Sequence, residues 1–272
     1  MVVDSNALQS PMLRDYLPES VSNFAVLTDY ASMEAYKGNT LVSIFRSMEI
    51  LADFPRQVTV LKTTGVVCGL RGRQPGLQRR LINHEQTRGF PKYCDRLFAA
   101  NPSDVSLRKQ LRHFGRAADA QMARMLADAA NIPEAIDGIA NTFTHAELKI
   151  IRTGMPFPEH LVRKILESVA MIFQSLYSQH PRPAVVRNVD ELPNTFLFRS
   201  ALCSFLWALD WISMAGPKGV KIEKIRNDLV DVNFATYATY FDGLLSMDEK
   251  PLRIYQRAAF VLESITSKPG DN

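Results

Sequence analysis

Four carboxylates run through an otherwise apolar and aromatic segment near the C-terminus, residues 227 to 248. They are Asp228, Asp231, Asp242 and Asp248. An unpaired charge is expensive to bury, so a segment of this kind needs a compensating group. A divalent metal ion bound by oxygen ligands is the simplest compensation, and it requires a fold that brings the acids together.

The rest of the composition is that of an ordinary globular protein. The chain has 272 residues, of which 46% are hydrophobic and 22% are charged, enough for one large domain or two small ones. The three cysteines are far apart and form no CxxC pair, which favours free thiols in a reducing compartment. The five histidines show no HxxxH or HExxH spacing, so a zinc site is not expected.

We expect a cytoplasmic protein that does not span a membrane. The first residues lack the basic region and apolar run of a secretory signal. The most apolar segment, residues 196 to 214, contains Arg199 and Asp210. This pattern predicts a buried core helix and not a membrane span.

A short apolar run over residues 23 to 29 ends in Asp29 and continues directly into a helix-forming sequence. This pattern predicts a buried strand and an α/β fold, in which ligands bind at the carboxyl ends of the strands. Residues 56 to 70 predict a second strand, and residues 243 to 246 a further strand that leads to Asp248. Residues 1 to about 22 show no clear period, and we expect an irregular arm there.

The acids of the predicted strands and of a late helix, residues 221 to 241, are expected to meet. Asp228 and Asp231 are three residues apart and so share one face of that helix. If the strands that lead to Asp29 and Asp248 are neighbours, both acids lie at one sheet edge under the helix acids. Carboxylates so close repel one another without a cation, and oxygen-only ligands favour Mg²⁺ or Mn²⁺ over zinc. Such a site supports attack of a metal-activated water on a phosphodiester.

Three motifs together resemble the PIN-like nuclease domain. They are a strand followed by Asp near the N-terminus, Asp-x-x-x-Ala-x-x-Ala on a late helix, and Asp-Gly-Leu-Leu-Ser-x-Asp before a final helix; the match covers mainly residues 23 to 50 and 220 to 265. The resemblance implies a three-layer α/β/α sandwich with a mainly parallel central sheet, and metal-dependent cleavage of RNA or, less often, DNA. It implies that Asp29 is the first-strand acid, Asp231 the helix acid and Asp248 the acid after the last strand.

The chain departs from the family pattern at the central Glu, which usually lies on a helix after the second strand. No Glu follows the predicted strand over residues 56 to 70, so Glu34 is the candidate substitute and Glu85 a weaker one. The middle of the chain is also longer than a minimal domain of this kind. We expect a single domain over residues 1 to 272, with a core at 23–70 and 184–266 and an inserted helical subdomain at about 71–183.

The segment from residue 62 to residue 124 is strongly basic. It carries thirteen Lys or Arg against four acids, a net charge of +9. A surface that binds phosphate groups, and therefore a nucleic-acid partner, is favoured. The resemblance to the PIN-like family implies that RNA is preferred to DNA. The candidate residues for this contact are Arg71, Arg73, Arg79, Arg80 and Lys92.

The sequence thus predicts a metal-dependent endonuclease in which Asp29, Asp231, Asp248 and Glu34 are catalytic. The predicted metal ligands are Asp29, Asp228, Asp231, Asp242 and Asp248. Two alternatives stay open: a degenerate PIN-like module that binds nucleic acid or protein without cleaving it, and a phosphohydrolase acting on nucleotides or small phosphoesters. A protein partner or a homo-oligomer stays open as well.

Each acid also has a plainer explanation. Asp228 and Asp231 have the spacing of a solvated helix face, and Glu34 is equally compatible with a surface position. Asp242 suits a turn, and Asp248 suits the cap of the last helix.

Overall fold

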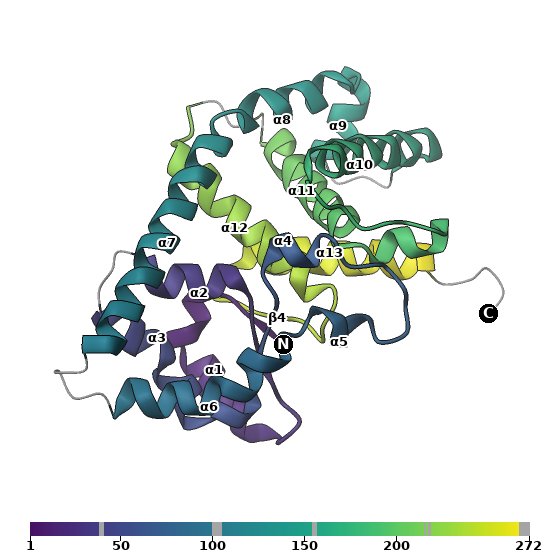
Figure 1. Cartoon of the computed structure of the whole chain (residues 1–272). Helices are drawn as coiled ribbons and strands as arrows, with labels where there is room; N and C mark the ends of the chain where they lie inside the picture. The colour runs from purple at the N-terminus through teal and green to yellow at the C-terminus, as the bar shows by residue number, and fades with distance from the viewer. Residues whose placement is uncertain (38–40, 100–104, 154–156, 215, 217–218, 267–272) are drawn as a thin grey trace.

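The computed structural model describes residues 1–37, 41–99, 105–153, 157–214, 216 and 219–266. A parallel sheet with the strand order β3-β2-β1-β4 lies among many helices (Figure 1). The strands are β1 (Val2–Val3), β2 (Ala25–Leu27), β3 (Val58–Val60) and β4 (Leu244–Leu245). The predicted α/β class with a parallel sheet is confirmed.

The irregular arm that we expected at the N-terminus is wrong. The first residues form β1, which lies between β2 and β4, and then η1 (Ser5–Gln9) and α1 (Pro11–Glu19). The side chain of Ser10 caps α1 by accepting a hydrogen bond from the backbone N–H of Met12, and Pro11 occupies the first turn, where its missing N–H costs nothing. The second predicted strand is also shorter than expected, because η3 (Pro55–Gln57) precedes β3 and α4 (Thr64–Val67) follows it.

Successive residues of the strands point to opposite faces of the sheet, and both faces are covered by helices. Val2 pairs with Val26 and with Leu244, and these residues belong to one hydrophobic cluster. Val3 and Leu245 belong to another. The first cluster is completed by side chains of α2 (Asp29–Tyr36), α7 (Val105–Ala129) and α12 (Ile222–Ala238), and the second by α1, α3 (Leu41–Asp53) and α6 (His84–Phe98).

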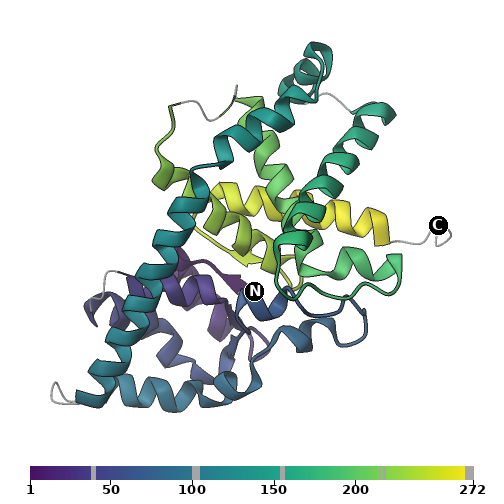
Figure 2. The same ribbon diagram turned by 45° about the horizontal axis from the view of Figure 1, so that its top comes forward.

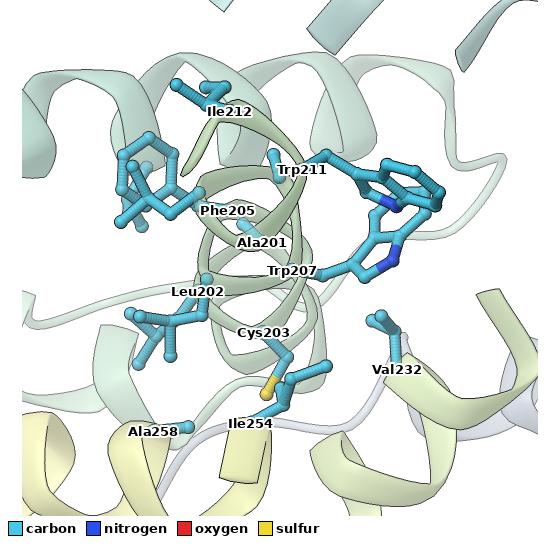
Figure 3. Packing of buried hydrophobic residues seen from close by; sticks show 14 of the residues in the cluster. Ala201, Leu202, Cys203, Phe205, Trp207, Trp211, Ile212, Val232, Ile254 and Ala258 are labelled. Atoms are coloured by element: carbon cyan, nitrogen blue, oxygen red, sulfur yellow. The ribbon is translucent and has the colours of Figure 1, made fainter. Parts of the chain in front are cut away.

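A third hydrophobic cluster, built mainly by helices, surrounds α11 (Phe196–Ser213). It includes side chains of α8 (Ile132–Asn141), α9 (His145–Thr153), α10 (Glu159–Gln179), α12 and α13 (Glu249–Thr266). Trp207 and Trp211 lie on one side of α11 near Val232, while Ile254 and Ala258 approach from α13 (Figure 3). Among the described helices, α11 alone is long and apolar enough to span a membrane, but 72% of that window is buried inside the protein.

The long helix α7 connects the two parts of the molecule (Figure 2). Of the segment predicted to be an insertion, α5 (Leu77–Leu81) and α6 contribute to the clusters around the sheet, whereas α8 to α10 pack around α11. The division into a core and an inserted subdomain stays a prediction.

Truncating a core aromatic ring of α11 should destabilise the whole protein. Phe205 is fully buried, so Phe205→Ala removes packing that the surroundings cannot replace, and we expect a loss of about 3–5 kcal/mol in the free energy of unfolding. Phe260 on α13 is 70% exposed, and Phe260→Ala should change that free energy by less than about 0.5 kcal/mol. Urea unfolding followed by circular dichroism measures both; equal losses would contradict the assignment of α11 as the core helix.

Candidate metal centre

Three carboxylates from distant parts of the chain meet at the carboxyl edge of the sheet. Asp4 follows β1, Asp231 lies on α12, and Asp248 follows β4. Each offers an oxygen atom, and these atoms all lie within 4.8 Å of one another. The meeting follows from the sheet register, because β1 and β4 are parallel neighbours with Val3 opposite Leu245. The acids that follow the two strands therefore emerge side by side.

Asp4 is the most deeply buried member of the group, with 2% of its surface exposed. Its backbone N–H donates to the carbonyl of Leu245 at 2.9 Å, which continues the β1–β4 ladder. Its carboxylate accepts hydrogen bonds from the hydroxyls of Ser246 at 2.6 Å and Ser5 at 3.3 Å. Burial raises the pKa of Asp4; Asp248 raises it further, and the two serines oppose the shift.

Asp248 is the exposed member of the group and is held by Asn6 and Ser246. The Asn6 amide donates to the Asp248 carboxylate at 2.8 Å, and its carbonyl accepts from the backbone N–H of Met247 at 3.1 Å. The backbone N–H of Asp248 donates to the Ser246 hydroxyl at 3.1 Å. The segments after β1 and β4 are thus tied together, and the site opens to solvent on the side of Asp248.

Asp231 is the member of the group whose pKa is raised to about 8. Burial is the largest cause of this pKa shift, and the charges of Asp4, Asp228 and Asp248 add to it, while Lys250 opposes it. Without a cation, therefore, Asp231 holds a proton at neutral pH, which relieves the repulsion among the carboxylates. A divalent cation at this point would supply the same compensation and displace the proton.

Asp228, which we predicted to be a metal ligand, lies beside the group but is not one of its members. It is 3% exposed, and each of its carboxylate oxygens has a partner inside the protein. The indole N–H of Trp207 donates to one oxygen at 3.1 Å, and the Lys250 ammonium forms an ion pair with the other. Both oxygens therefore contribute to the attachment of α12 to α11 and α13.

Glu34 is connected to the carboxylate group by the Ser5 hydroxyl. One of its carboxylate oxygens accepts from the Ser5 hydroxyl at 2.7 Å, and that hydroxyl is also within hydrogen-bond distance of Asp4. The other oxygen pairs with Lys37 at 2.9 Å. Glu34 lies on α2, the helix that follows β2, and its side chain is 14% exposed.

The predicted convergence of Asp29 with Asp231 and Asp248 is wrong. Among the described residues, Asp29 is not a member of the carboxylate group, because β2 and β4 lie on opposite sides of β1 and are not neighbours. Asp29 instead accepts hydrogen bonds from the backbone N–H of Thr64 at 2.7 Å and from its hydroxyl at 2.8 Å. Its carboxylate therefore anchors the start of α4 to the start of α2. Burial raises the pKa of Asp29, and the bonds from Thr64 oppose the shift.

Asp242 is also away from the predicted metal site. It is exposed and precedes β4, whereas Asp248 follows β4, so the two acids belong to opposite ends of the same strand. Burial lowers the pKa of the Met1 amino group, and the charge of Asp242 opposes that shift. Burial raises the pKa of the Tyr16 phenol, and Asp242 adds to it. The spacing along the chain suggested that Asp242 is a metal ligand. Because β4 separates it from Asp248, Asp242 lies at the opposite edge of the sheet from the carboxylate group.

Sequence reasoning missed Asp4 and the polar residues around it, Ser5, Asn6 and Ser246. The signal was the run Val2-Val3-Asp4, an apolar pair that ends in an acid, as the run before Asp29 does. Two residues are too few to show a period, so the run was not recognised as a strand.

The five basic residues that we predicted to contact nucleic acid fall into two groups. Arg71 pairs with Glu191 at 3.1 Å, and the Arg80 guanidinium donates to the backbone carbonyls of Pro75, Arg71 and Arg73. Arg80 therefore holds the loop before α5 together. Arg73, Arg79 and Lys92 are exposed. Binding of nucleic acid by these side chains stays a prediction.

Comparisons with known proteins add no further identification. No protein-family model, no curated protein and no solved structure matches the chain. The PIN-like resemblance and the function therefore depend on the residues and their placement.

The raised pKa of Asp231 makes stability depend on pH. The folded protein holds a proton on Asp231 up to about pH 8, while an unfolded Asp releases it near pH 4. Between these values the folded state binds more protons than the unfolded state, so stability falls as pH rises, by at most about 1.4 kcal/mol per pH unit. In EDTA, Asp231→Asn should therefore lose less stability than the wild type between pH 5 and pH 8 in urea titrations. Parallel curves for the two proteins would contradict the assignment.

Removing one partner of the Asp228–Lys250 ion pair should destabilise the protein more than neutralising both partners. Lys250→Met leaves the buried Asp228 carboxylate without its counter-charge, and we expect a loss of about 2–3 kcal/mol in the free energy of unfolding, because Lys250 itself is partly exposed. Combining it with Asp228→Asn removes that charge and should recover part of the loss. Urea unfolding of the two single variants and the double variant forms the cycle; strictly additive losses would show that the pair is not coupled.

Proposed function

We propose that this protein is a metal-dependent endonuclease of PIN-like type that uses Mg²⁺ or Mn²⁺ and cleaves RNA in preference to DNA. The observation that carries the proposal is the meeting of Asp4, Asp231 and Asp248 within 4.8 Å. These residues come from the beginning and the end of the chain, as the acids of the family do. Oxygen-only ligands are those that Mg²⁺ and Mn²⁺ prefer.

The residues present fit such an ion in number and spacing. Oxygen ligands lie about 2.0–2.1 Å from Mg²⁺, so two ligands on opposite sides of one ion are roughly 4.2 Å apart. The three carboxylate oxygens lie within 4.8 Å of one another, so small side-chain adjustments would bring them to this spacing. Burial and the neighbouring carboxylates raise the pKa of Asp231, and a cation at this point would favour its charged form.

The placement of Glu34 supports the family assignment. The family carries its central Glu on a helix after the second strand, and with β1 counted, β2 is the second strand and α2 the helix after it. Glu34 lies on α2, and Asp4 takes the first-strand place that we had given to Asp29. The helices on both faces of the parallel sheet agree with a three-layer sandwich.

In this proposal the side chains of the site have distinct roles. Asp4, Asp231 and Asp248 would hold the ion, which when bound supplies an activated water and stabilises the charge of the phosphodiester. Ser5 and Ser246 orient the Asp4 carboxylate, and Glu34 holds Ser5. Asn6 orients Asp248, and Lys250 places a positive charge near Asp231. These contacts hold the three carboxylates in one arrangement before substrate binds.

The two alternative functions have less support. A degenerate binding module was suggested by the apparent lack of a central Glu, and the position of Glu34 beside Ser5 removes that reason. A phosphohydrolase for small phosphoesters would need an enclosed pocket around the acids. Asp248 is instead exposed, so the site faces solvent and suits a polymeric substrate.

The proposal predicts cleavage of labelled single-stranded RNA in Mn²⁺ and no cleavage in EDTA. Asp4→Asn and Asp231→Asn remove a metal ligand, and each should lower the rate by at least about 100-fold, measured by gel electrophoresis of the products. Asp242→Asn is the matched control, because it removes the same charge at the other end of β4, and its rate should stay at the wild-type level.

Asp29→Asn separates the two assignments of the first-strand acid. If its cleavage rate fell as far as that of Asp4→Asn while the protein stayed folded, Asp29 and not Asp4 would belong to the site. Absence of cleavage by the wild type in both Mn²⁺ and Mg²⁺, or equal rates for wild type and Asp231→Asn, would reject the nuclease proposal.

A further inference from the structure

A surface groove of about 370 Å³ lies where the end of α2, the middle of α7 and the first half of α12 meet. In Figures 1 and 2 these three helices lie side by side. The groove is lined by Lys37, Asp119, Met122, Ala123, Leu126 and Arg226.

The groove adjoins the three carboxylates through contacts that begin at Lys37. Lys37 pairs with Glu34, which accepts a hydrogen bond from Ser5, the residue next to Asp4. Arg226 precedes Asp231 by five residues on α12, which is about 7.5 Å along the helix axis, with the two side chains on different sides of the helix. The contacts from Lys37 through Glu34 to Ser5 therefore give the connection between the groove and the carboxylates.

The lining combines an apolar surface with two cations, Lys37 and Arg226, and one carboxylate, Asp119. Met122 and Leu126 are four residues apart on α7 and so share one face, with Ala123 between them. The Arg226 guanidinium donates to the neutral side-chain carbonyl of Asn227, whereas Lys37 pairs with Glu34. A nucleotide has the complementary chemistry, with a flat base for the apolar surface and a phosphate for the cations.

Positive charge continues from the groove along α7. Arg112 and Arg116 are exposed and four residues apart, so they lie on one helix face, and Asp119 and Ala123 of the groove continue that face. The predicted contact residues Arg71, Arg73, Arg79, Arg80 and Lys92 do not line the groove. The cations of α7 thus mark a different path for a phosphate backbone.

We propose that this groove binds a nucleotide of single-stranded RNA next to the phosphodiester that is cleaved. The base lies against Met122 and Leu126, Arg226 and Lys37 contact the adjacent phosphate, and Arg116 contacts the next one. A single strand is required, because a base in a duplex is stacked and paired and cannot reach the apolar surface. The inference rests on the proposed nuclease function, and it names the form of its substrate.

The test measures binding without cleavage. A fluorescein-labelled 12-nucleotide RNA is titrated with protein in EDTA, and its anisotropy is recorded at several salt concentrations. Each phosphate contact contributes about 0.7 to the slope of log K against log salt for a single strand. Arg226→Gln and Arg116→Gln should therefore each reduce the slope by about that amount and weaken binding several-fold. Arg163→Gln on α10 is the matched control, since it removes an exposed cation far from α7 and should leave the slope unchanged.

Three results would reject the proposal that the groove binds RNA. They are no RNA binding by the wild type, equal salt slopes for Arg226→Gln, Arg116→Gln and Arg163→Gln, or equal affinity for the 12-mer and for a duplex of the same sequence. The cleavage assay in Mn²⁺ tests the nuclease proposal separately from the groove. Groove-dependent binding without cleavage in Mn²⁺ would reject the nuclease and retain the binding site, whereas cleavage with unchanged slopes would reject the groove alone.

Discussion

The parallel pairing of β1 with β4 joins the two ends of the chain, and the candidate site depends on it. Val2 and Val3 are fully buried. On either side of Val3, the backbone N–H of Val2 donates to the Gly243 carbonyl and that of Asp4 donates to the Leu245 carbonyl, both at 2.9 Å. The pairing brings Asp4 beside Ser246 and the segment that leads to Asp248. A shift of this register by one residue would turn Val2 and Val3 to the wrong faces of the sheet. The hydrophobic clusters on the two faces thus hold the carboxylates in place.

Packing against the sheet has an electrostatic cost, and neighbouring groups offset part of it. Asp4 and Asp231 are drawn out of water by the same burial that attaches α12 to β1, which raises the pKa of both. Ser246 stabilises the charge on Asp4, and Lys250 stabilises the charges on Asp228 and Asp231. The compensation within the protein remains incomplete at Asp231. The cation of the proposed function would complete this compensation.

Much of the fold follows from local patterns, but the order of the strands does not. The buried run before Asp29 and the late helix with Asp231 were predicted from apolar spacing, and the run before Asp248 from its position between a turn and a helix. β1 was missed because two valines at the start of the chain show no period. That omission displaced the strand numbering by one, so β2, which leads to Asp29, was taken for the first strand of the sheet. Which strands are neighbours is decided by packing between distant segments, which no local pattern contains.

Asp4 and Asp29 show why the pattern of a strand followed by an acid is insufficient to assign a ligand. Both residues follow parallel strands at the same sheet edge and both are withdrawn from solvent, but their surroundings differ. Asp29 lies against the N-terminus of α4, where the backbone N–H and the hydroxyl of Thr64 satisfy its two oxygens. Asp4 receives hydrogen bonds from the hydroxyls of Ser5 and Ser246 and from the Ser5 backbone, but it also faces two other carboxylates. Hydrogen bonds therefore do not distinguish the two acids, because both oxygens of each have partners inside the protein. The difference is the proximity of other carboxylates, which repel Asp4 and not Asp29. For this reason the proposed metal site is assigned to Asp4, Asp231 and Asp248.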